Sequence, residues 1–527
     1  MIDRREFCLS LAAMGTTAAL FGLVEVSGQT HSMDLEEATI GDLQLAMQKG
    51  TMSSASITAW YIARIKSHDR DTNSIIEINP DAIAIAEGLD RERKAGKLRG
   101  PLHGIPVVLK DNIDTADKMK TTAGSLALMD APVPQRDAFL VEQLRRAGAV
   151  VLAKTNLSEW ANFRSTTATS GWSGRGGQTK NPYILDRNPC GSSSGTGAAI
   201  ASNFAAIGVG TETDGSIVCP SSICGIVGIK PTVGLISRSG VIPISASQDT
   251  AGPMTRTVAD AATMLSAMTA VDASDPATAR NSTMARTDYE TFLKPDGLKG
   301  AAIGVAREFW GKRPEVDGIM DSALDAMKKA GATLVDVKFG NLEKFGDAEF
   351  EVLQFEFKDG LAKYLAGRGS QYKNLDDLIK FNNDNAAREM PHFKQEIFVT
   401  SAKKGPLTTK EYLDARALCL KLTREEGIDA AMKKDKLDAI IAPSNAPTWM
   451  TDWVNGDCGS NYISSSSLAA IAGYPSITVP AGFLHELPIG LSFIGMPYTE
   501  HVLIRLAYAF EQITKARRKP KFLVTAQ

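Results

Sequence analysis

Short apolar runs alternate with amphipathic stretches over much of the chain. Residues 105–110 (IPVVLK) and 149–156 (AVVLAKTN) have the length and apolar content of buried strands. Between them, residues 138–148 place apolar side chains at helical spacing and end in a glycine. This order of strand, helix and strand predicts a mixed, partly parallel α/β sheet that helices cover on both faces.

The same periodicity predicts further elements on either side of this unit. Amphipathic helices are expected at residues 42–49, 56–66 and 80–96. Apolar strands are expected at residues 437–442, 476–480 and 491–495. Residues 272–434 are more polar and more helical, with a helix and strand unit at 321–337, which indicates an insertion that borders the candidate site.

No linker, repeat or low-complexity tract divides the 527 residues, so we expect one large domain over residues 33–520. The apolar content of 43% is enough for a large core. A net charge of −2 argues against general binding to nucleic acid or to an anionic membrane. The basic run at residues 515–521 (KARRKPK) is expected to be a solvated helix end.

Residues 1–29 differ from the rest of the chain. Arg4 and Arg5 precede a modestly apolar segment rich in small residues at positions 8–24, a pattern typical of a twin-arginine export signal cleaved near residues 27–30. The pattern predicts export to the periplasm or the outside of a bacterial cell, without stable membrane insertion after cleavage. An N-terminal helix or membrane anchor is the alternative, and the polar Ser10 weakens it.

Candidate chemistry is concentrated in residues 188–234, where two glycine-rich turns that carry serines flank one short stretch of helical character. Glycine lets backbone N–H groups approach a reacting oxygen, and serine supplies a hydroxyl that attacks or relays a proton, so this composition favours acyl transfer. Upstream, Lys110 ends an apolar run. Because burial disfavours a charged ammonium, Lys110 is a candidate neutral base. The alternative is a charged lysine paired with Asp111.

These residues resemble the motifs of the amidase signature family. The first serine motif of that family corresponds to residues 189–196 and places its serine at Ser192, and the second corresponds to residues 210–218 and places its nucleophile at Ser216. The two serines have the separation found in the family, and the family's lysine falls on Lys110. The resemblance implies the amidase signature fold and a Ser-Ser-Lys triad, in which Ser216 attacks a carbonyl and Ser192 relays its proton to neutral Lys110.

The resemblance also implies the geometry around the triad. A cis peptide bond is expected between Gly191 and Ser192, and Ser193 is expected to support that turn by hydrogen bonding. The turn that delivers Ser216 presents three backbone N–H groups as the oxyanion hole, those of Thr213, Asp214 and Gly215. The six histidines form no HxH or HExxH pattern, so we expect no catalytic metal and no cofactor.

Departures from the family pattern narrow the resemblance. Glu212, Asp214 and Val218 replace its usual aspartate, glycine and arginine. Together with three further segments, the variant motif resembles the bacterial peptide amidases; the segments are residues 158–164, 171–182 and 247–254. This subgroup hydrolyses carboxyl-terminal amides of peptides, which implies a small amide or peptide amide as substrate. We also expect a monomer, because the most similar relatives act alone.

Four alternatives are open at this point. Within the family, the chain is a general aliphatic or aryl amidase, or a glutaminase-type subunit of an amidotransferase, which conflicts with an export signal. Outside enzymes, a periplasmic amide-binding protein uses the same pocket without turnover. Finally, residues 191–195 satisfy G-x-S-x-G with Ser193 as the nucleophile of an α/β-hydrolase, but residues 183–190 have the composition of a loop rather than of the strand that this motif needs.

Cysteine and tryptophan positions give weaker indications. Beyond residues 1–29 there are five cysteines, an odd number at scattered positions. Cys219 and Cys224 are candidates for a disulfide in an oxidising compartment, although we favour buried free thiols. Three tryptophans are candidates either for the pocket or for the core: Trp172, Trp449 and Trp453.

Overall fold

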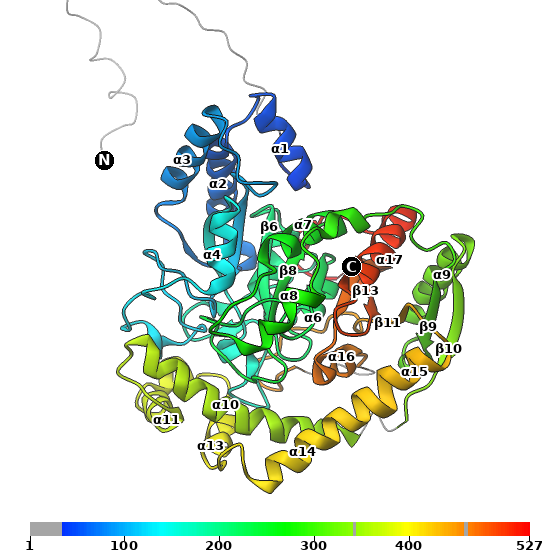
Figure 1. Cartoon of the computed structure of the whole chain (residues 1–527). Helices are drawn as coiled ribbons and strands as arrows, with labels where there is room; N and C mark the ends of the chain where they lie inside the picture. The colour runs from blue at the N-terminus through cyan, green and yellow to red at the C-terminus, as the bar shows by residue number, and fades with distance from the viewer. Residues whose placement is uncertain (1–33, 341–343, 458–461, 527) are drawn as a thin grey trace, which may run out of the picture. The chain divides into compact units, whose positions relative to one another are not determined.

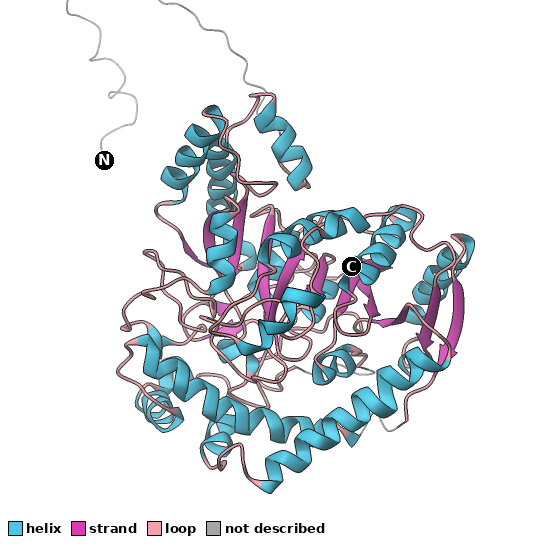
Figure 2. Ribbon diagram, in the orientation of Figure 1, coloured by secondary structure: helices cyan, strands magenta, loops and turns pink. Residues whose placement is uncertain are grey.

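An 11-stranded mixed β-sheet passes through the middle of the protein in the order β1-β3-β2-β6-β8-β7-β12-β13-β11-β9-β10 (Figures 1 and 2). The computed structural model describes residues 34–340, 344–457 and 462–526, so the expected export signal lies outside the described residues. Residues Glu36–Gln527 form one compact unit. The α/β fold with a large mixed sheet and helices on both faces confirms the expected fold class.

In chain order, the strands of this sheet are β1 (Ile75–Ile78), β2 (Pro106–Lys110), β3 (Val150–Thr155), β6 (Ile207–Glu212), β7 (Val227–Lys230), β8 (Thr250–Thr255), β9 (Ala302–Ala306), β10 (Thr333–Val337), β11 (Ala439–Pro443), β12 (Ser476–Leu484) and β13 (Leu487–Ile494). A separate two-stranded ribbon joins β4 (Trp172–Ser173) to β5 (Gly177–Gln178). Strand β2 is parallel to both β3 and β6, and β9 is parallel to β10 and β11. The strands between β6 and β11 pair in antiparallel fashion.

The α-helices are α1 (Ile40–Gln48), α2 (Ser54–Thr72), α3 (Ala82–Lys94), α4 (Phe139–Arg146), α5 (Ser194–Ala201), α6 (Val218–Ile223), α7 (Val258–Met268), α8 (Asn281–Met284), α9 (Pro314–Lys329), α10 (Gly346–Arg368), α11 (Leu375–Asp384), α12 (Ala386–Glu389), α13 (Glu396–Ala402), α14 (Lys410–Leu420), α15 (Asp429–Lys434), α16 (Ser466–Ala472) and α17 (Glu500–Thr514). Two other helical turns matter below, the 3₁₀ turn η3 (Pro276–Arg280) and the π-helical turn η7 (Lys421–Ile428). Among the described residues, no helix is long and apolar enough to cross a membrane.

Helices α5 and α6 contact each other and lie on one face of the sheet, whereas α7 and α17 contact each other on the opposite face. Every residue of α5 is buried, and its sequence SGTGAAIA contains mostly small side chains. Small side chains let α5 approach β2, β3 and β6 closely. The loop that precedes α5 is therefore held directly against the ends of these parallel strands.

The more helical stretch at residues 272–434 contributes both to the sheet and to a layer beside it. Its strands β9 and β10 form one edge of the central sheet. From α10 to α15 it is helical, and Figure 1 shows the long helices α10 and α14 running along the lower border of the view. Helix α10 contributes Leu353 and Phe357 to a core cluster with Trp160 and Phe163. Apolar packing therefore joins this layer to the segment that follows β3.

The basic run after α17 ties the end of the compact unit to its beginning. Helix α17 ends at Thr514, so the run is not the solvated helix end that the sequence predicted. Instead, Arg517 forms an ion pair with Glu37 at 2.7 Å and donates to the carbonyl of Gly225 at 2.7 Å. The Arg517 side chain is only 12% exposed. Its burial lets it serve as a structural cation rather than as a surface charge.

Candidate active site

Lys110 is the last residue of β2, and the parallel strand β6 brings Thr211 beside it. The Lys110 side chain is fully buried. Its Nζ donates to Ser192 Oγ at 2.7 Å, to Thr211 Oγ1 at 2.9 Å and to the Thr211 carbonyl at 3.2 Å. Asp111, the alternative partner, lies instead 3.3 Å from the Arg175 guanidinium. Lys110 therefore contacts uncharged oxygens, one of which is a serine hydroxyl.

Ser192 lies in the loop that precedes α5. The expected cis peptide bond between Gly191 and Ser192 is present. The carbonyl oxygen of Ser192 accepts the N–H of Ser158 at 3.1 Å. A Cβ atom at Gly191 would lie 2.2 Å from Ser158 Oγ, so no larger residue fits at this position. The close packing of this loop sets the direction of the buried Ser192 hydroxyl toward Lys110.

Ser216 occupies the turn between β6 and α6 and is 8% exposed. Its carbonyl oxygen accepts the N–H of Ser193 at 3.2 Å, which joins the two serine turns. The carboxylate of Glu212 accepts the N–H groups of Ile217 and Val218 at 2.8 and 2.9 Å. Glu212 therefore holds the backbone just after Ser216, at a position where many relatives have an aspartate.

Ser193 is fully buried and does not line the cavity that contains Ser216. Its Oγ donates to the Thr211 carbonyl at 3.0 Å and accepts the Thr211 N–H at 3.2 Å. Both hydroxyl functions are thus used by the backbone of β6. A nucleophile on a strand-to-helix elbow needs an exposed hydroxyl, so this geometry does not favour Ser193 as the attacking group.

Burial lowers the pKa of Lys110 from its ordinary value to about 7, although the carboxylates of Asp249 and Glu212 act in the opposite direction. Removing an ammonium from water costs free energy that uncharged oxygens do not fully return. A large fraction of Lys110 is therefore neutral near pH 7, and this is the state in which it accepts a proton from Ser192.

The rate should follow this ionisation. We expect kcat/KM to rise with pH, with a midpoint at about 7, because only the neutral lysine acts as a base. Below the midpoint the rate should fall about tenfold for each pH unit. The measurement is kcat/KM between pH 5 and 9 on an amide without ionisable groups. A flat profile between pH 6 and 8 would contradict the assignment of Lys110.

Thr213, the first residue of the expected oxyanion turn, is held by the segment before β8. Thr213 Oγ1 donates to Asp249 at 2.6 Å, and Gln248 Nε2 donates to the Thr213 carbonyl at 3.2 Å. Gln248 also donates to Glu349 of α10 at 2.8 Å. The sequence singled out residues 247–254 as a motif but gave no role to Gln248 or Asp249, since a contact between segments so far apart in the chain leaves no periodic signal.

Asp214, the second residue of the turn, points its carboxylate toward α16 and α10. Ser466 Oγ and Ser467 Oγ each donate to it at 2.6 Å. Burial, together with the nearby Asp214 carboxylate, raises the pKa of Glu349 well above its ordinary range. Glu349 is therefore protonated near neutral pH and hydrogen-bonds to Asp214. None of these three partners had a signal in the sequence.

A cavity of about 900 Å³ opens onto Ser216. The three residues of the expected oxyanion turn line it, as do Gly191 and a mixture of apolar and polar side chains, including Phe163, Ile244, Leu353, Trp449, Asp457, Tyr462 and Ser466. Asp214 and Asp457 are the acidic groups, and the described lining residues include no lysine, arginine or histidine. The cavity therefore combines aromatic walls with a negative electrostatic character.

The three tryptophans have different environments. Trp449 lines the cavity, and its indole N–H donates to Asp457 at 3.1 Å. Trp172 is buried in the core against Phe393 and the Arg164 guanidinium. Trp453 is 48% exposed and stacks on His392. Only Trp449 of the three is therefore positioned to contact a molecule beside Ser216.

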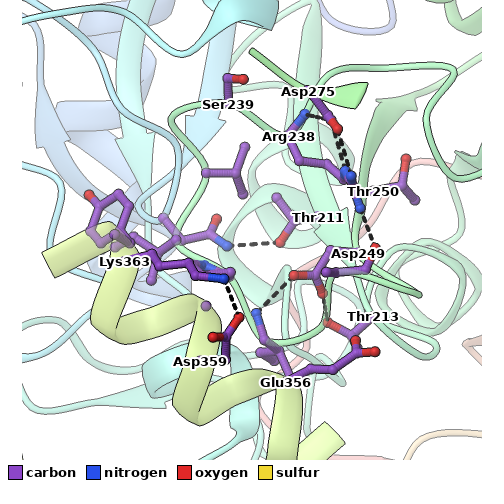
Figure 3. A pocket seen from close by; sticks show the side chains of 18 of the residues that line it. Thr211, Thr213, Arg238, Ser239, Asp249, Thr250, Asp275, Glu356, Asp359 and Lys363 are labelled. Atoms are coloured by element: carbon purple, nitrogen blue, oxygen red, sulfur yellow. Dashed lines mark hydrogen bonds and ion pairs between the residues drawn. The ribbon is translucent and has the colours of Figure 1, made fainter. Parts of the chain in front are cut away.

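A second cavity of about 530 Å³ adjoins the first, because Ala161, Thr213 and Ile244 line both. Figure 3 shows its side chains, with Asn112 Nδ2 donating to Thr211 Oγ1 at 3.0 Å. Its charged groups include two close pairs, Arg238 with Asp275 at 2.6 Å and Lys363 with Asp359 at 2.6 Å. This cavity reaches Thr211, the hydrogen-bond partner of Lys110, from the side of α10.

A disulfide joins Cys190 to Cys219, which corrects the sequence expectation. Cys224 is a buried free thiol, as is Cys419, whereas Cys458 lies outside the described residues. Cys219 lies in α6, and Cys224 is its C-cap. Residues five apart on a helix point in different directions, so these two cysteines cannot pair. The observed bond connects the loop that contains Ser192 to the helix that follows Ser216.

Removing this bond should affect both stability and rate. The Cys190→Ser/Cys219→Ser variant is expected to lose about 3–4 kcal/mol of stability, because the bond closes a loop of 29 residues. The melting temperature should fall by ~3 °C. A looser arrangement of the two serine turns should lower kcat roughly tenfold. Calorimetry and steady-state rates test this, with Cys224→Ala as the control that removes an unbonded thiol; equal effects in the two variants would contradict it.

Comparison with known proteins identifies the class to which this fold and site belong. The family described as Amidase matches residues 56–504, and the chain therefore belongs to the amidase signature family and is an amide hydrolase. Among solved structures it is similar to the native peptide amidase from Stenotrophomonas maltophilia, with 47% identity, a TM-score of 0.87, and coverage of 93% of this chain and 99% of that one. A structure of a peptide amidase in complex with the competitive inhibitor chymostatin gives 47% identity and a TM-score of 0.89, covering 92% of this chain and 99% of that one.

A curated relative extends the comparison to eukaryotes. A probable amidase of Arabidopsis thaliana is 39% identical, over 94% of this chain and 93% of the relative. In bacteria, a glutamyl-tRNA(Gln) amidotransferase polypeptide of Moorella thermoacetica is 34% identical, over 93% of this chain and 99% of that protein. The protein is thus an amidase that is close to peptide amidases.

Proposed function

We propose that the protein hydrolyses the carboxyl-terminal amide of peptides through Ser216, Ser192 and Lys110. The observation that carries the proposal is the 2.7 Å hydrogen bond between Lys110 Nζ and Ser192 Oγ, in a buried site beside the turn that presents Ser216 to a cavity. A buried lysine with a pKa of about 7 is an effective base at neutral pH. No other buried lysine contacts a serine in the part of the chain that the structure describes.

The reaction then follows from the roles of these groups. Ser216 Oγ attacks the amide carbonyl, and its proton passes through Ser192 to neutral Lys110. The backbone N–H groups of Thr213, Asp214 and Gly215 stabilise the developing oxyanion. The protonated lysine returns the proton through Ser192 to the leaving nitrogen, which departs as ammonia. Water, activated by the same groups, then releases the acid and restores Ser216.

The character of the cavity supports a neutral amide attached to a larger acyl group. A volume of about 900 Å³ is at the upper end of small-molecule pockets, which gives space for more than a simple aliphatic amide. Trp449 and Tyr462 provide flat apolar surface for the side chains of a peptide. Asp214 and Asp457 disfavour a carboxylate beside Ser216, so the product acid is repelled after the amide is cleaved.

The same charges argue against free glutamine as substrate. Glutamine carries an α-carboxylate, and a site for it needs a cationic partner. The described residues that line the Ser216 cavity provide none. The similarity to amidotransferase polypeptides therefore supports shared amide chemistry rather than a shared substrate.

We further propose that the protein acts outside the cytoplasm. Disulfides persist in oxidising compartments and are rare in the bacterial cytosol. The bond between Cys190 and Cys219 supports an exported protein, in agreement with the twin-arginine pattern near Arg4 and Arg5. Fractionation of cells that express the full chain tests this; retention of the protein in the cytosol, with both thiols free, would contradict it.

The test of the substrate is a panel of amides. Ammonia or amine release is measured for peptide carboxyl-terminal amides, for anilides and for short aliphatic amides, with Ser216→Ala as the inactive control. We expect peptide amides to have the highest kcat/KM, and internal peptide bonds to be spared. A preference for anilides or small amides would replace the substrate but keep the mechanism, and no release from any of them would support a binding protein.

A further inference from the structure

A third cavity, far smaller than the one at Ser216, is lined by three arginines. It has a volume of about 360 Å³ and lies where η3, α14 and η7 meet the segment after α16. Arg280 comes from η3, Arg416 from α14 and Arg424 from η7. The described residues that line the cavity include no aspartate or glutamate. Three positive charges therefore face one small space without an acidic counter-charge in its wall.

The hydrogen bonds of the arginines leave most of their donors available. Arg424 Nε donates to the Ala472 carbonyl at 2.8 Å, and its guanidinium lies over the Tyr474 ring. The Nη1 atom of Arg416 is buried and has no hydrogen-bond partner among the described residues. Arg280 is exposed at the surface. The cavity therefore presents guanidinium N–H groups that are free to bind an added acceptor.

The nearest carboxylates have other partners. Asp429 accepts the Tyr474 hydroxyl at 2.9 Å, and Glu500 accepts the N–H and hydroxyl of Thr232 at 2.7 and 2.5 Å. Glu356 accepts the N–H of Ser247 at 2.9 Å. These acids hold the walls of the cavity instead of neutralising the arginines. Like charges gathered in this way repel one another, and an anion placed between them removes that repulsion.

We propose that this cavity binds a small anion of the phosphate type, either free phosphate or the phosphate group of a small metabolite. Guanidinium groups match phosphate oxygens in pairs, and three of them arriving from separate elements surround a tetrahedral anion better than a planar one. Tyr498 and Thr232, which also line the cavity, add hydroxyl groups. A volume of 360 Å³ also accommodates a short organic group beside the phosphate.

The position of the cavity connects the helical layer to the elements that support the oxyanion turn. Ala246 and Ser247 line it and immediately precede the two residues that hold Thr213. Gly473 and Tyr474 line it and follow α16, whose serines hold Asp214. A bound anion therefore bridges α14 and η7 to the catalytic core. The inference rests on this geometry alone and is independent of the amide that the enzyme cleaves.

The test is binding of inorganic phosphate to the full chain, measured by calorimetry and by the shift in melting temperature at constant ionic strength set with sodium chloride. We expect saturable binding and a rise in melting temperature with phosphate concentration. Arg416→Gln/Arg424→Gln should raise the dissociation constant at least tenfold, whereas Arg91→Gln, which removes an exposed charge from α3, should leave it unchanged. Glycerol phosphate in place of phosphate distinguishes a metabolite site, if it binds more tightly, from a site for the free ion.

A second variant protects the test against misfolding. Arg280→Gln changes an exposed side chain, so it should fold normally and still weaken phosphate binding by a measurable factor. Equal dissociation constants in the wild type and in both arginine variants would overturn the proposal. An identical shift with chloride alone, or no saturable binding of phosphate or glycerol phosphate, would also overturn it. Loss of amide hydrolysis in Ser216→Ala should leave phosphate binding intact.

Discussion

Replacing Ser216 by alanine is expected to lower kcat by roughly 10⁴- to 10⁶-fold while the fold is retained. The expected size follows from loss of the nucleophile, since the oxyanion donors alone give only modest acceleration. Because the Ser216 side chain is at the cavity wall, its removal should change stability by less than about 1 kcal/mol. Turnover of a peptide amide and thermal unfolding are the two measurements.

The control for this variant is Ser193→Ala. Ser193 is adjacent to Ser192 in the same loop, but its hydroxyl hydrogen-bonds only to the backbone of Thr211. Its removal should cost about 1–3 kcal/mol of stability and leave activity within about tenfold of wild type. The opposite ranking, with Ser193→Ala inactive and Ser216→Ala active, would show that the nucleophile is Ser193.

Lys110→Met should reduce kcat by about 10³- to 10⁴-fold, because Ser192 then has no base to receive its proton. Methionine has a similar length and no charge, so it should occupy the buried position without an ionic penalty. The residual activity should also lose its dependence on pH near 7. Single-turnover rates at pH 6 and pH 8 therefore test the role of Lys110 separately from its contribution to the fold.

A neighbouring lysine provides the matched control. Lys154, near the corresponding end of β3, is also fully buried, but its Nζ donates to the Ile113 carbonyl at 2.6 Å and to Thr121 Oγ1 at 2.8 Å. Lys154→Met should lower stability and leave kcat per folded molecule within about tenfold. If both variants lost activity to the same extent, Lys110 would be a structural cation and not the base.

The sequence predicted the elements whose periodicity is strong. The apolar run at residues 105–110 is β2, the stretch at 80–96 contains α3, and the run at 476–480 is the first half of β12. The strands β6 and β8 were missed. Strand β6 (IGVGTE) contains two glycines and ends in charge, and β8 contains Pro253, which is unusual in a central strand. Tertiary pairing determines these strands more than local preference does.

For the site, motif spacing was sufficient only where the residues lie on the motifs themselves. Lys110 and Ser192 are in contact, and Ser216 faces the cavity. The supporting contacts of Asp249, Glu349 and the α16 serines come from segments far apart in the chain, so no spacing rule indicates them. The disulfide partner of Cys219 was missed for the same reason, since only the folded loops show that Cys190 lies beside it.

The ion pair between Arg517 and Glu37 has a consequence for the order of the chain. Since it brings the last segment of the compact unit against the first, a short peptide is able to join residue 521 to residue 36. New ends then fit in the exposed loop at residues 95–98, between α3 and β2. Such a circular permutant keeps every contact of the site, because the catalytic groups depend on neighbouring strands and not on the position of the termini. The enzyme therefore has a natural seam at which its gene can be reopened, fused or linked to a partner.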